Sequence, residues 1–338
     1  MTSSPKADTH PAANERLSGV RDIQTRILRQ VMRRVAGGCS LLEGLFWGNG
    51  GPEQPPLFIV GVPRGGTTLI YQSICGCMSA SYPTELTNWL PICPAFATRL
   101  SRLWCSRQVC FRSRYGRSTR FSAPGEGTMW NLWLEKYRWY DGAGELTRGE
   151  RQQVNRVVGR LERQLHLPFV NKNLRHNQRI RLLAELFPNA MFLVVIRDPF
   201  QVAVSLLRGR LEQRGDSESW FSIKPRSFVQ HEGESPGTSV VLQVKGLLDD
   251  IANDIAVLDA ARVRVIEYER FCDRPLVALN AVSEWAQACG ARLTVKREPP
   301  TSFEVSARTD GVPRETIDEI AALVEAIRMP SLPSSLRL

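Results

Sequence analysis

The chain is poor in lysine and histidine and lacks long apolar runs. Its 338 residues hold 44 basic side chains, of which six are lysines and 38 are arginines, and only four histidines. No run of about 18 apolar residues occurs, which excludes a transmembrane helix on length. Residues 1–16 have no apolar core of the kind found in a secretory signal. The eight cysteines form no CxxC pair, which argues against a zinc site, and we expect reduced thiols in a cytoplasmic protein.

The excess of positive charge predicts an anionic partner. The formal net charge is +10, with 44 Lys and Arg against 34 Asp and Glu. Hydrophobic residues make up 43% and charged residues 23%, which is ordinary for a folded protein and excludes a wholly disordered or fibrous chain. Charge alone leaves several partners open: nucleic acid, membrane phosphates, a nucleotide, or a sulfated or carboxylated substrate.

The pattern divides the chain into a polar N-terminus, a basic segment and one domain. We expect residues 1–20 to be disordered. Apolar residues four apart among arginines predict a basic amphipathic helix over 21–36, followed by a linker to residue 50. That helix either packs on the domain with a solvated arginine face or contacts an anionic membrane surface. A single domain is expected over 57–330, with a polar lid-like loop near 213–246 that is rich in Gly, Ser and Pro.

Three short apolar runs predict buried parallel strands. These are LFIVG (57–61), MFLVVI (191–196) and VRVIEY (263–268), and helical patterns lie between them. The alternation indicates a parallel sheet with right-handed crossovers. Thr147 and Glu150 have the spacing of a capping box before a further helix.

A glycine-rich turn follows the first of these runs. Residues 61–68 read GVPRGGTT, and in the pattern G-x-x-x-x-G-K-[ST] Thr67 takes the lysine position. Successive backbone N–H groups and the N-terminus of the next helix form an anion cradle in such a turn. The missing lysine indicates a phosphate loop that works without a triphosphate or magnesium, and we expect no metal. The fold class predicted is α/β, a three-layer P-loop-like fold with a central parallel sheet flanked by helices.

A second anion site is predicted after the run at 191–196. Arg197 lies at its carboxyl end, where open α/β sheets bind ligands. Asp198 and Pro199 suit the cap and first position of a helix, and Ser205 lies two turns into it. An arginine with a serine hydroxyl makes a compact phosphate site, although a structural Arg-Asp pair is the alternative. The two sites together predict a nucleotide-like ligand with anions at two separated positions.

Both motifs resemble those of sulfotransferases. VPRGGTT is similar to the family's 5′-phosphosulfate loop, and VIRDPFQVAVS to its 3′-phosphate motif, over a region from about residue 57 to about 290. The resemblance, closest to bacterial and Golgi-type members, implies 3′-phosphoadenosine-5′-phosphosulfate (PAPS) as donor. The acceptor would be a hydroxyl of a carbohydrate, glycolipid or other small molecule. The donor-binding residues that it implies are Arg64, Gly65, Gly66, Thr67, Thr68, Arg197 and Ser205.

The resemblance also implies three catalytic residues. Relatives that modify glycans and tyrosines carry a glutamate base shortly after the loop helix, and YPTEL places Glu85 there. Asn-Lys-Asn is similar to a segment whose lysine contacts the transferring group, which assigns that role to Lys172. Arg64 is expected to bind the leaving phosphate. A helix-cap role for Glu85 and a surface position for Lys172 are the alternatives, and His176 is expected to be a satisfied polar residue.

Two clusters outside these motifs bear on the acceptor. The stretch 99–120 has seven arginines and no acidic residue, with interleaved aromatic residues, and favours an anionic or sugar-bearing acceptor or else a solvated surface. A second aromatic group predicts an acceptor pocket or core packing of a helix: Trp130, Trp133, Tyr137, Trp139 and Tyr140. Two other functions stay open, a P-loop nucleotide kinase and a basic nucleic-acid or membrane-binding protein without catalysis. The missing loop lysine argues against the kinase, and nucleic acid is the less favoured partner.

Overall fold

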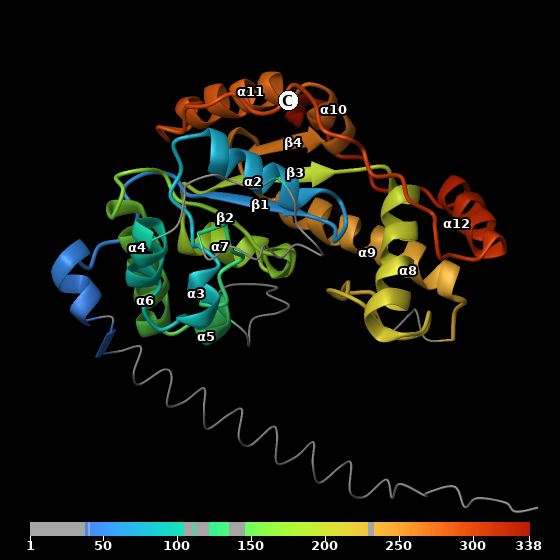
Figure 1. Ribbon diagram of the computed structural model, residues 1–338, viewed down its shortest axis with the longest axis horizontal. Helices are drawn as coiled ribbons and strands as arrows, with labels where there is room; N and C mark the ends of the chain where they lie inside the picture. The colour runs from blue at the N-terminus through green and yellow to red at the C-terminus, as the bar shows by residue number, and fades with distance from the viewer. Residues whose placement is uncertain (1–37, 40, 105–110, 112–121, 135–145, 229–232) are drawn as a thin grey trace, which may run out of the picture.

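The computed structural model describes residues 38, 39, 41–104, 111, 122–134, 146–228 and 233–338 (Figure 1). The predicted disordered N-terminus, the basic helix over 21–36 and most of the stretch 99–120 lie outside the described residues. So do three of the aromatic residues singled out above, Tyr137, Trp139 and Tyr140.

Four parallel strands form the central sheet, in the order β2-β1-β3-β4. Their bounds are β1 Leu57–Gly61, β2 Val170–Lys172, β3 Met191–Ile196 and β4 Val263–Glu267. β1, β3 and β4 match the three apolar runs, except that Tyr268 begins a helix rather than ending a strand. β2 was not predicted, because its three residues carry no apolar run. Its end pairs Lys172 with Ile59 of β1, so both strands deliver their carboxyl ends to the same edge.

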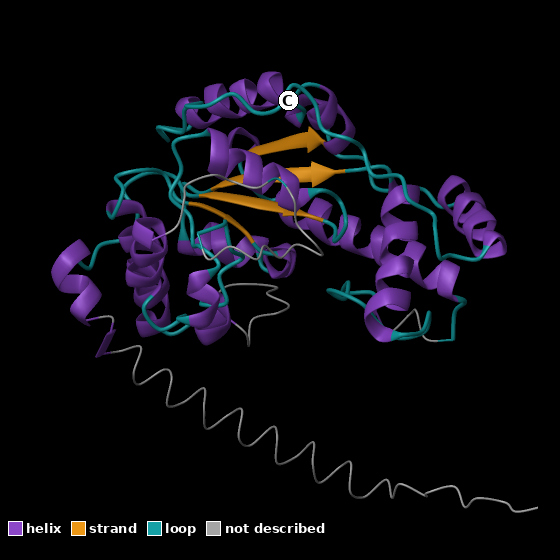
Figure 2. Ribbon diagram, in the orientation of Figure 1, coloured by secondary structure: helices purple, strands orange, loops and turns teal. Residues whose placement is uncertain are grey.

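Side chains alternate between the two faces of the sheet and build two separate cores. Leu57 and Ile59 of β1 face a core with the helices α2 (Thr67–Cys77), α10 (Tyr268–Asp273) and α11 (Pro275–Ala288). Phe58 and Val60 face a core with α5 (Trp130–Leu134), α6 (Arg148–Arg163) and α7 (Ile180–Leu186). Figure 2 shows helices on both faces of the sheet. β1 and β3 are buried up to Ile196 at the end of β3 because both faces of the sheet are covered, which explains their continuous apolar sequences. In β4, Arg264 and Glu267 are only partly buried. The predicted three-layer α/β fold is therefore confirmed.

The helices begin and end where capping residues allow. Thr147 and Glu150 form a complete capping box at α6, and Asp198 accepts a hydrogen bond from the Phe200 amide at the start of α8, both as predicted. Pro275 occupies the first turn of α11. The α-helices are α2 Thr67–Cys77, α3 Leu86–Trp89, α4 Pro94–Trp104, α5 Trp130–Leu134, α6 Arg148–Arg163, α7 Ile180–Leu186, α8 Pro199–Arg214, α9 Pro236–Ile255, α10 Tyr268–Asp273, α11 Pro275–Ala288 and α12 Arg314–Ala326. The described residues also form the 3₁₀ helices η1 Leu174–Gln178, η3 Ala260–Arg262 and η4 Ser334–Leu336.

The loop expected over 213–246 is shorter than predicted. α8 continues to Arg214, and α9 begins at Pro236, capped by the Ser235 hydroxyl, which accepts from the Thr238 amide. The apolar residues early in α9 pack with α8 and α12 in a third core, beside the sheet in Figure 1. Ser-Pro-Gly at 235–237 marks a helix start here and not a continuing loop.

Two further features complete the description of the fold. A helix over 41–47 lies inside the segment predicted as a linker, and its buried Glu43 accepts hydrogen bonds from the amides of Ala95 and Phe96 at the start of α4. Within the described residues, no helix combines the length and apolar character needed to cross a bilayer. The six cysteines of this part of the chain are free thiols.

Candidate functional site

The loop between β1 and α2 presents the N-terminus of α2 with no side chain capping it. Gly66 is the N-cap residue, with φ +86°, and a Cβ there would lie 2.0 Å from Cδ2 of Tyr268. Glycine is therefore required both by the backbone and by the ring packed against it. Arg64 also has a positive φ of 67°. Free backbone N–H groups and the helix dipole make this end of α2 an anion site.

Asn177 fixes the start of this loop, a role that no motif in the sequence predicted. Its side-chain amide donates to the Gly61 carbonyl oxygen at 2.7 Å and accepts from the Gly61 amide at 3.0 Å. Because β2 ends at Lys172, opposite Ile59, these two groups of Gly61 have no strand partner on that side. The Asn177 amide takes the place of the missing strand, so the loop begins from a fully hydrogen-bonded position.

Arg64, Arg197 and Ser205 come together although two of them are more than 130 residues from the first. Arg64 donates through Nε to Oγ of Ser205 at 2.9 Å, and Arg197 donates through Nη1 to the Arg64 carbonyl oxygen at 3.0 Å. Arg197 also donates to the Ser306 carbonyl oxygen and lies over the Tyr268 ring, 4.6 Å from its centroid. The two predicted anion-binding motifs are thus one connected group of side chains.

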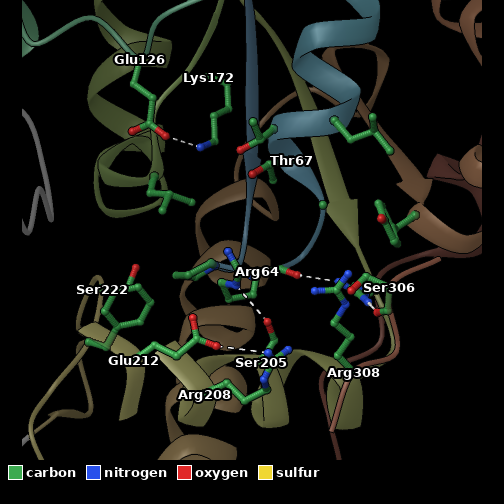
Figure 3. A pocket seen from close by; sticks show the side chains of 18 residues that line it. Arg64, Thr67, Glu126, Lys172, Ser205, Arg208, Glu212, Ser222, Ser306 and Arg308 are labelled. Carbon is green, nitrogen blue, oxygen red and sulfur yellow. Dashed lines mark hydrogen bonds and ion pairs between the residues drawn. The ribbon is translucent and has the colours of Figure 1, made fainter. Parts of the chain in front are cut away.

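These residues open onto a cavity of about 660 Å³ at the carboxyl edge of the sheet (Figure 3). Seven of the predicted site residues line it: Arg64, Gly66, Thr67, Thr68, Lys172, Arg197 and Ser205. Five cationic side chains face only two acidic ones, Glu126 and Glu212. A cavity of this size and charge suits a drug-sized polyanion.

Two predicted residues are not part of the lining. Gly65 turns the loop, where its amide donates to the Val62 carbonyl oxygen at 3.0 Å. Glu85 is the N-cap residue of α3, and its carboxylate accepts from Nδ2 of Asn88 at 2.6 Å. This is the helix-terminus position that was the alternative to a catalytic role.

Several lining residues were missed by the motif reading. Arg208 and Glu212 follow Ser205 by three and seven positions on α8, so helical periodicity could have placed them on the same face. Arg208 pairs with Glu212 and with Asp310, each at 3.1 Å. Its Nε is buried without a hydrogen-bond partner, as is that of Arg197, which lies 3.9 Å from a Glu269 carboxylate oxygen.

Ser306 and Arg308 line the cavity from the segment that follows the last strand-helix unit. Their sequence carries no recognisable motif, and only the fold brings them to the cavity. In Figure 3 they lie on the same side as Arg64 and Ser205, across from Glu126 and Lys172.

Lys172 is buried and paired with a carboxylate. Its side chain is 2% exposed and its ammonium forms an ion pair with Glu126, whose own side chain is 37% exposed. The predicted surface-lysine alternative is therefore wrong, since a buried ammonium requires an anionic partner. Glu126 carried no sequence signal.

A buried polar network lies behind Lys172. His176 and the Trp130 indole both bond to Oδ1 of Asn171, at 2.8 Å and 2.9 Å. Burial, followed by the nearby Arg179 and Lys172 charges, lowers the pKa of His176 well below its usual 6.5, so the ring is neutral. His176 is the satisfied polar residue that was expected, and Trp130 is packed in the core.

The remaining acceptor candidates do not reach the cavity in the described part of the chain. Trp133 is buried in the same core as Trp130, which confirms the core-packing alternative for both. Arg102 lies over the Tyr82 ring at 4.4 Å and Arg99 is exposed. Among the described residues, no group of three or more His, Cys, Asp or Glu side chains is arranged to hold a metal ion.

Comparison with known proteins identifies the family. The model of the Sulfotransferase family matches residues 55–288, more than half of the chain. Sulfotransferase STF9 from Mycobacterium avium aligns over 82% of this chain and 78% of its own, at 18% identity and a TM-score of 0.47. The sulfotransferase domain from the curacin biosynthetic pathway aligns over 83% and 94%, at 19% identity and a TM-score of 0.41. STF1 from Mycobacterium tuberculosis H37Rv aligns over 80% and 77%, at 13% identity and a TM-score of 0.43. No curated protein matches the chain. The chain belongs to the sulfotransferase family, which transfers sulfuryl groups.

Proposed function

We propose that this sulfotransferase takes its sulfuryl group from PAPS and transfers it to a hydroxyl of a carbohydrate, a glycolipid or another small acceptor. The observation that supports PAPS as the donor is that the uncapped N-terminus of α2 and Arg197 line the same cavity. PAPS has anionic groups at both ends of an adenosine. A cavity with one anion site at the helix terminus and another on Arg197 and Ser205 fits that arrangement.

The residues divide between the two ends of the donor. The amides of Gly66, Thr67 and Thr68, together with Arg64, would hold the 5′-phosphosulfate. Arg197 and Ser205 would hold the 3′-phosphate. The leaving phosphate gains negative charge as the sulfuryl group departs, so cations and amides already in position lower the barrier. Lys172 would contact the transferring group.

The loop chemistry favours PAPS over a nucleoside triphosphate. Thr67 stands where kinases place the lysine that reaches the β- and γ-phosphates. The residue that follows β3 is Arg197, which is cationic, whereas a magnesium ligand at a strand end is acidic.

Calorimetry with 3′-phosphoadenosine-5′-phosphate (PAP), the product nucleotide, tests the donor. We expect micromolar binding in the presence of a metal chelator. Arg197→Met should weaken it by about tenfold or more, since it removes charged hydrogen bonds. Arg328→Met, at an exposed position on the far end of the chain, is the matched control and should leave binding unchanged.

Two results would overturn the donor assignment. Binding of ATP that requires magnesium, with no response to PAP, would support a kinase. Silence to both nucleotides would support a protein that only binds polyanions. The acceptor class is tested by a labelled-sulfate transfer screen against sugars, lipids and phenols, read by mass spectrometry.

A further inference from the structure

Glu126 is an acidic residue in a cavity that is otherwise cationic. Of the two carboxylates in the lining, Glu212 is engaged with Arg208 on its own helix. Glu126 instead contacts Lys172, at the end of β2 and directly beside the strand that leads into the phosphate loop. Figure 3 shows Glu126 and Lys172 on one side of the cavity, with Thr67 nearby and Arg64 beyond it. Glu126 and Lys172 thus lie across the cavity from Arg64, Arg208 and Arg308 (Figure 3).

The backbone around Glu126 is held firmly, whereas its carboxylate is accessible. Its carbonyl oxygen accepts from Nδ2 of Asn173 at 3.1 Å and from Nδ2 of Asn171 at 3.4 Å. The neighbouring Gly125 donates to the Pro83 carbonyl oxygen at 2.8 Å, and a Cβ on Gly125 would lie 2.7 Å from the Thr84 carbonyl oxygen. A side chain on a fixed backbone, more than a third exposed and facing a cavity, has the preorganisation that proton transfer requires.

Glu85 supports this loop rather than reaching the cavity. Its carboxylate accepts from Nδ2 of Asn88, and Oδ1 of Asn88 accepts from the Thr128 amide at 2.9 Å. Glu85 also donates its own amide to the Ala123 carbonyl oxygen at 2.9 Å. It is therefore a positioning residue for the segment that carries Glu126.

We propose that Glu126 is the general base for the acceptor hydroxyl and that Lys172 moves from Glu126 to the sulfuryl group when the donor binds. The proposal rests on the proposed function. In the transfer step the acceptor proton passes to a Glu126 carboxylate oxygen, and the acceptor oxygen forms the new O–S bond. The bond between sulfur and the 5′-phosphate oxygen breaks, and its electron pair stays on that phosphate. Glu126 then returns the proton to water.

The exchange of partners follows from the burial of Lys172. An ammonium that is 2% exposed needs an anion, and without donor Glu126 supplies it, with Oε1 as the contact atom. The anionic oxygens of a bound sulfuryl group are a second partner for the same ammonium. When Lys172 turns to them, Oε1 of Glu126 becomes available to accept a hydrogen bond from the acceptor hydroxyl. The base is thus released only when there is a sulfuryl group to transfer.

The test uses the full chain and three isosteric variants. Glu126→Gln removes the proposed base, Glu85→Gln tests the competing assignment, and Glu284→Gln on the exposed face of α11 is the matched control. Calorimetry measures PAP and PAPS affinity, and release of PAP from PAPS, with water or any acceptor found in the screen, measures turnover. Thermal unfolding confirms that each variant is folded.

We expect Glu126→Gln to bind PAP like the wild-type protein and to lose about 100-fold or more in turnover. Its affinity for PAPS relative to PAP should rise about threefold or more, because Lys172 no longer has to leave a carboxylate. Glu85→Gln should keep turnover within about tenfold, since a glutamine oxygen still accepts from Asn88.

Three outcomes would overturn the proposal. One is turnover of Glu126→Gln within threefold of wild type. Another is loss of turnover in Glu85→Gln while Glu126→Gln keeps it. The third applies if neither the wild-type protein nor any variant shows turnover. In that case, a ratio of PAPS affinity to PAP affinity in Glu126→Gln that equals the wild-type ratio overturns the proposal. If Glu126→Gln is unfolded, Glu126→Met, which also lacks a carboxylate, replaces it, with turnover within threefold of wild type as the refuting result. Failure of the wild-type protein to bind PAP would instead refute the proposed function, so the two failures are distinguishable.

Discussion

Replacement of Asn177 by alanine should destabilise the protein through the backbone of β1 rather than through lost packing. Asn177 is fully buried, and its amide satisfies both the N–H and the C=O of Gly61. In Asn177→Ala both groups stay buried without a partner. Each unsatisfied group costs about 1–3 kcal/mol, and a water that enters the vacated space recovers part of this, so we expect a loss of about 3 kcal/mol.

The expected thermal shift is large enough to measure. For a domain of roughly 300 residues, at about 2.1 cal/mol/K per residue, about 3 kcal/mol corresponds to roughly 5 °C in the midpoint of thermal unfolding. Because Gly61 begins the phosphate loop, PAP affinity should fall as well. Asn253→Ala, on the exposed side of α9, is the matched control and should change stability by less than about 0.5 kcal/mol.

Asn177→Asp separates the loss of hydrogen bonds to the Gly61 backbone from the loss of side-chain packing. Aspartate has nearly the same volume and keeps an acceptor for the Gly61 amide, but its second oxygen faces the Gly61 carbonyl and brings a buried charge. We therefore expect Asp to be at least as destabilising as Ala. If Asp is tolerated, or if Asn177→Ala melts within 1 °C of Asn253→Ala, the argument from backbone satisfaction is refuted.

Three further predictions concern the loop, the cavity and pH. Gly66→Ala should lower both the unfolding midpoint and PAP affinity, because its Cβ would meet the Tyr268 ring and a positive φ costs about 1–2 kcal/mol for an L-residue; unchanged affinity would contradict this. Arg208→Met should weaken PAP binding about tenfold in calorimetry, since it removes a cationic side chain from the cavity lining; an effect below twofold would remove Arg208 from the donor site. Burial lowers the pKa of His176, so the unfolded chain binds a proton that the folded chain does not, and stability is lost as pH falls below about 6.5. The stability lost between pH 7.5 and 5.5 should be missing from the unfolding curves of His176→Gln.

The sequence was most informative where structure depends on near neighbours along the chain. The apolar runs of β1, β3 and β4 and the capping box of α6 were all predicted, since burial of consecutive residues and a cap three positions from its partner leave local patterns. The predicted loop near 213–246 extended too far, into α9, because Ser-Pro-Gly is compatible with a loop and with a helix terminus. Only the packing of its apolar residues on α8 and α12 decides between them.

The candidate site shows the same division. The turn between β1 and α2 is contiguous, and its strand–turn–helix course could be predicted because the backbone conformation depends on glycines within the same few residues. β2 could not be predicted, since three residues become a strand only by pairing with β1. Its position in turn places Lys172 beside the loop.

By itself, the sequence determined the α/β class, the family resemblance and the two anion-binding motifs. The tertiary structure alone decided that Arg64 meets Ser205, that Arg208 and Arg308 face the same cavity, and that Glu126 rather than Glu85 lies in it. The physical reason is that a motif records interactions within a few residues. A cavity at the edge of a parallel sheet is assembled from chain segments whose spacing along the sequence is set by the crossovers between strands, and those carry no information about what they bring together.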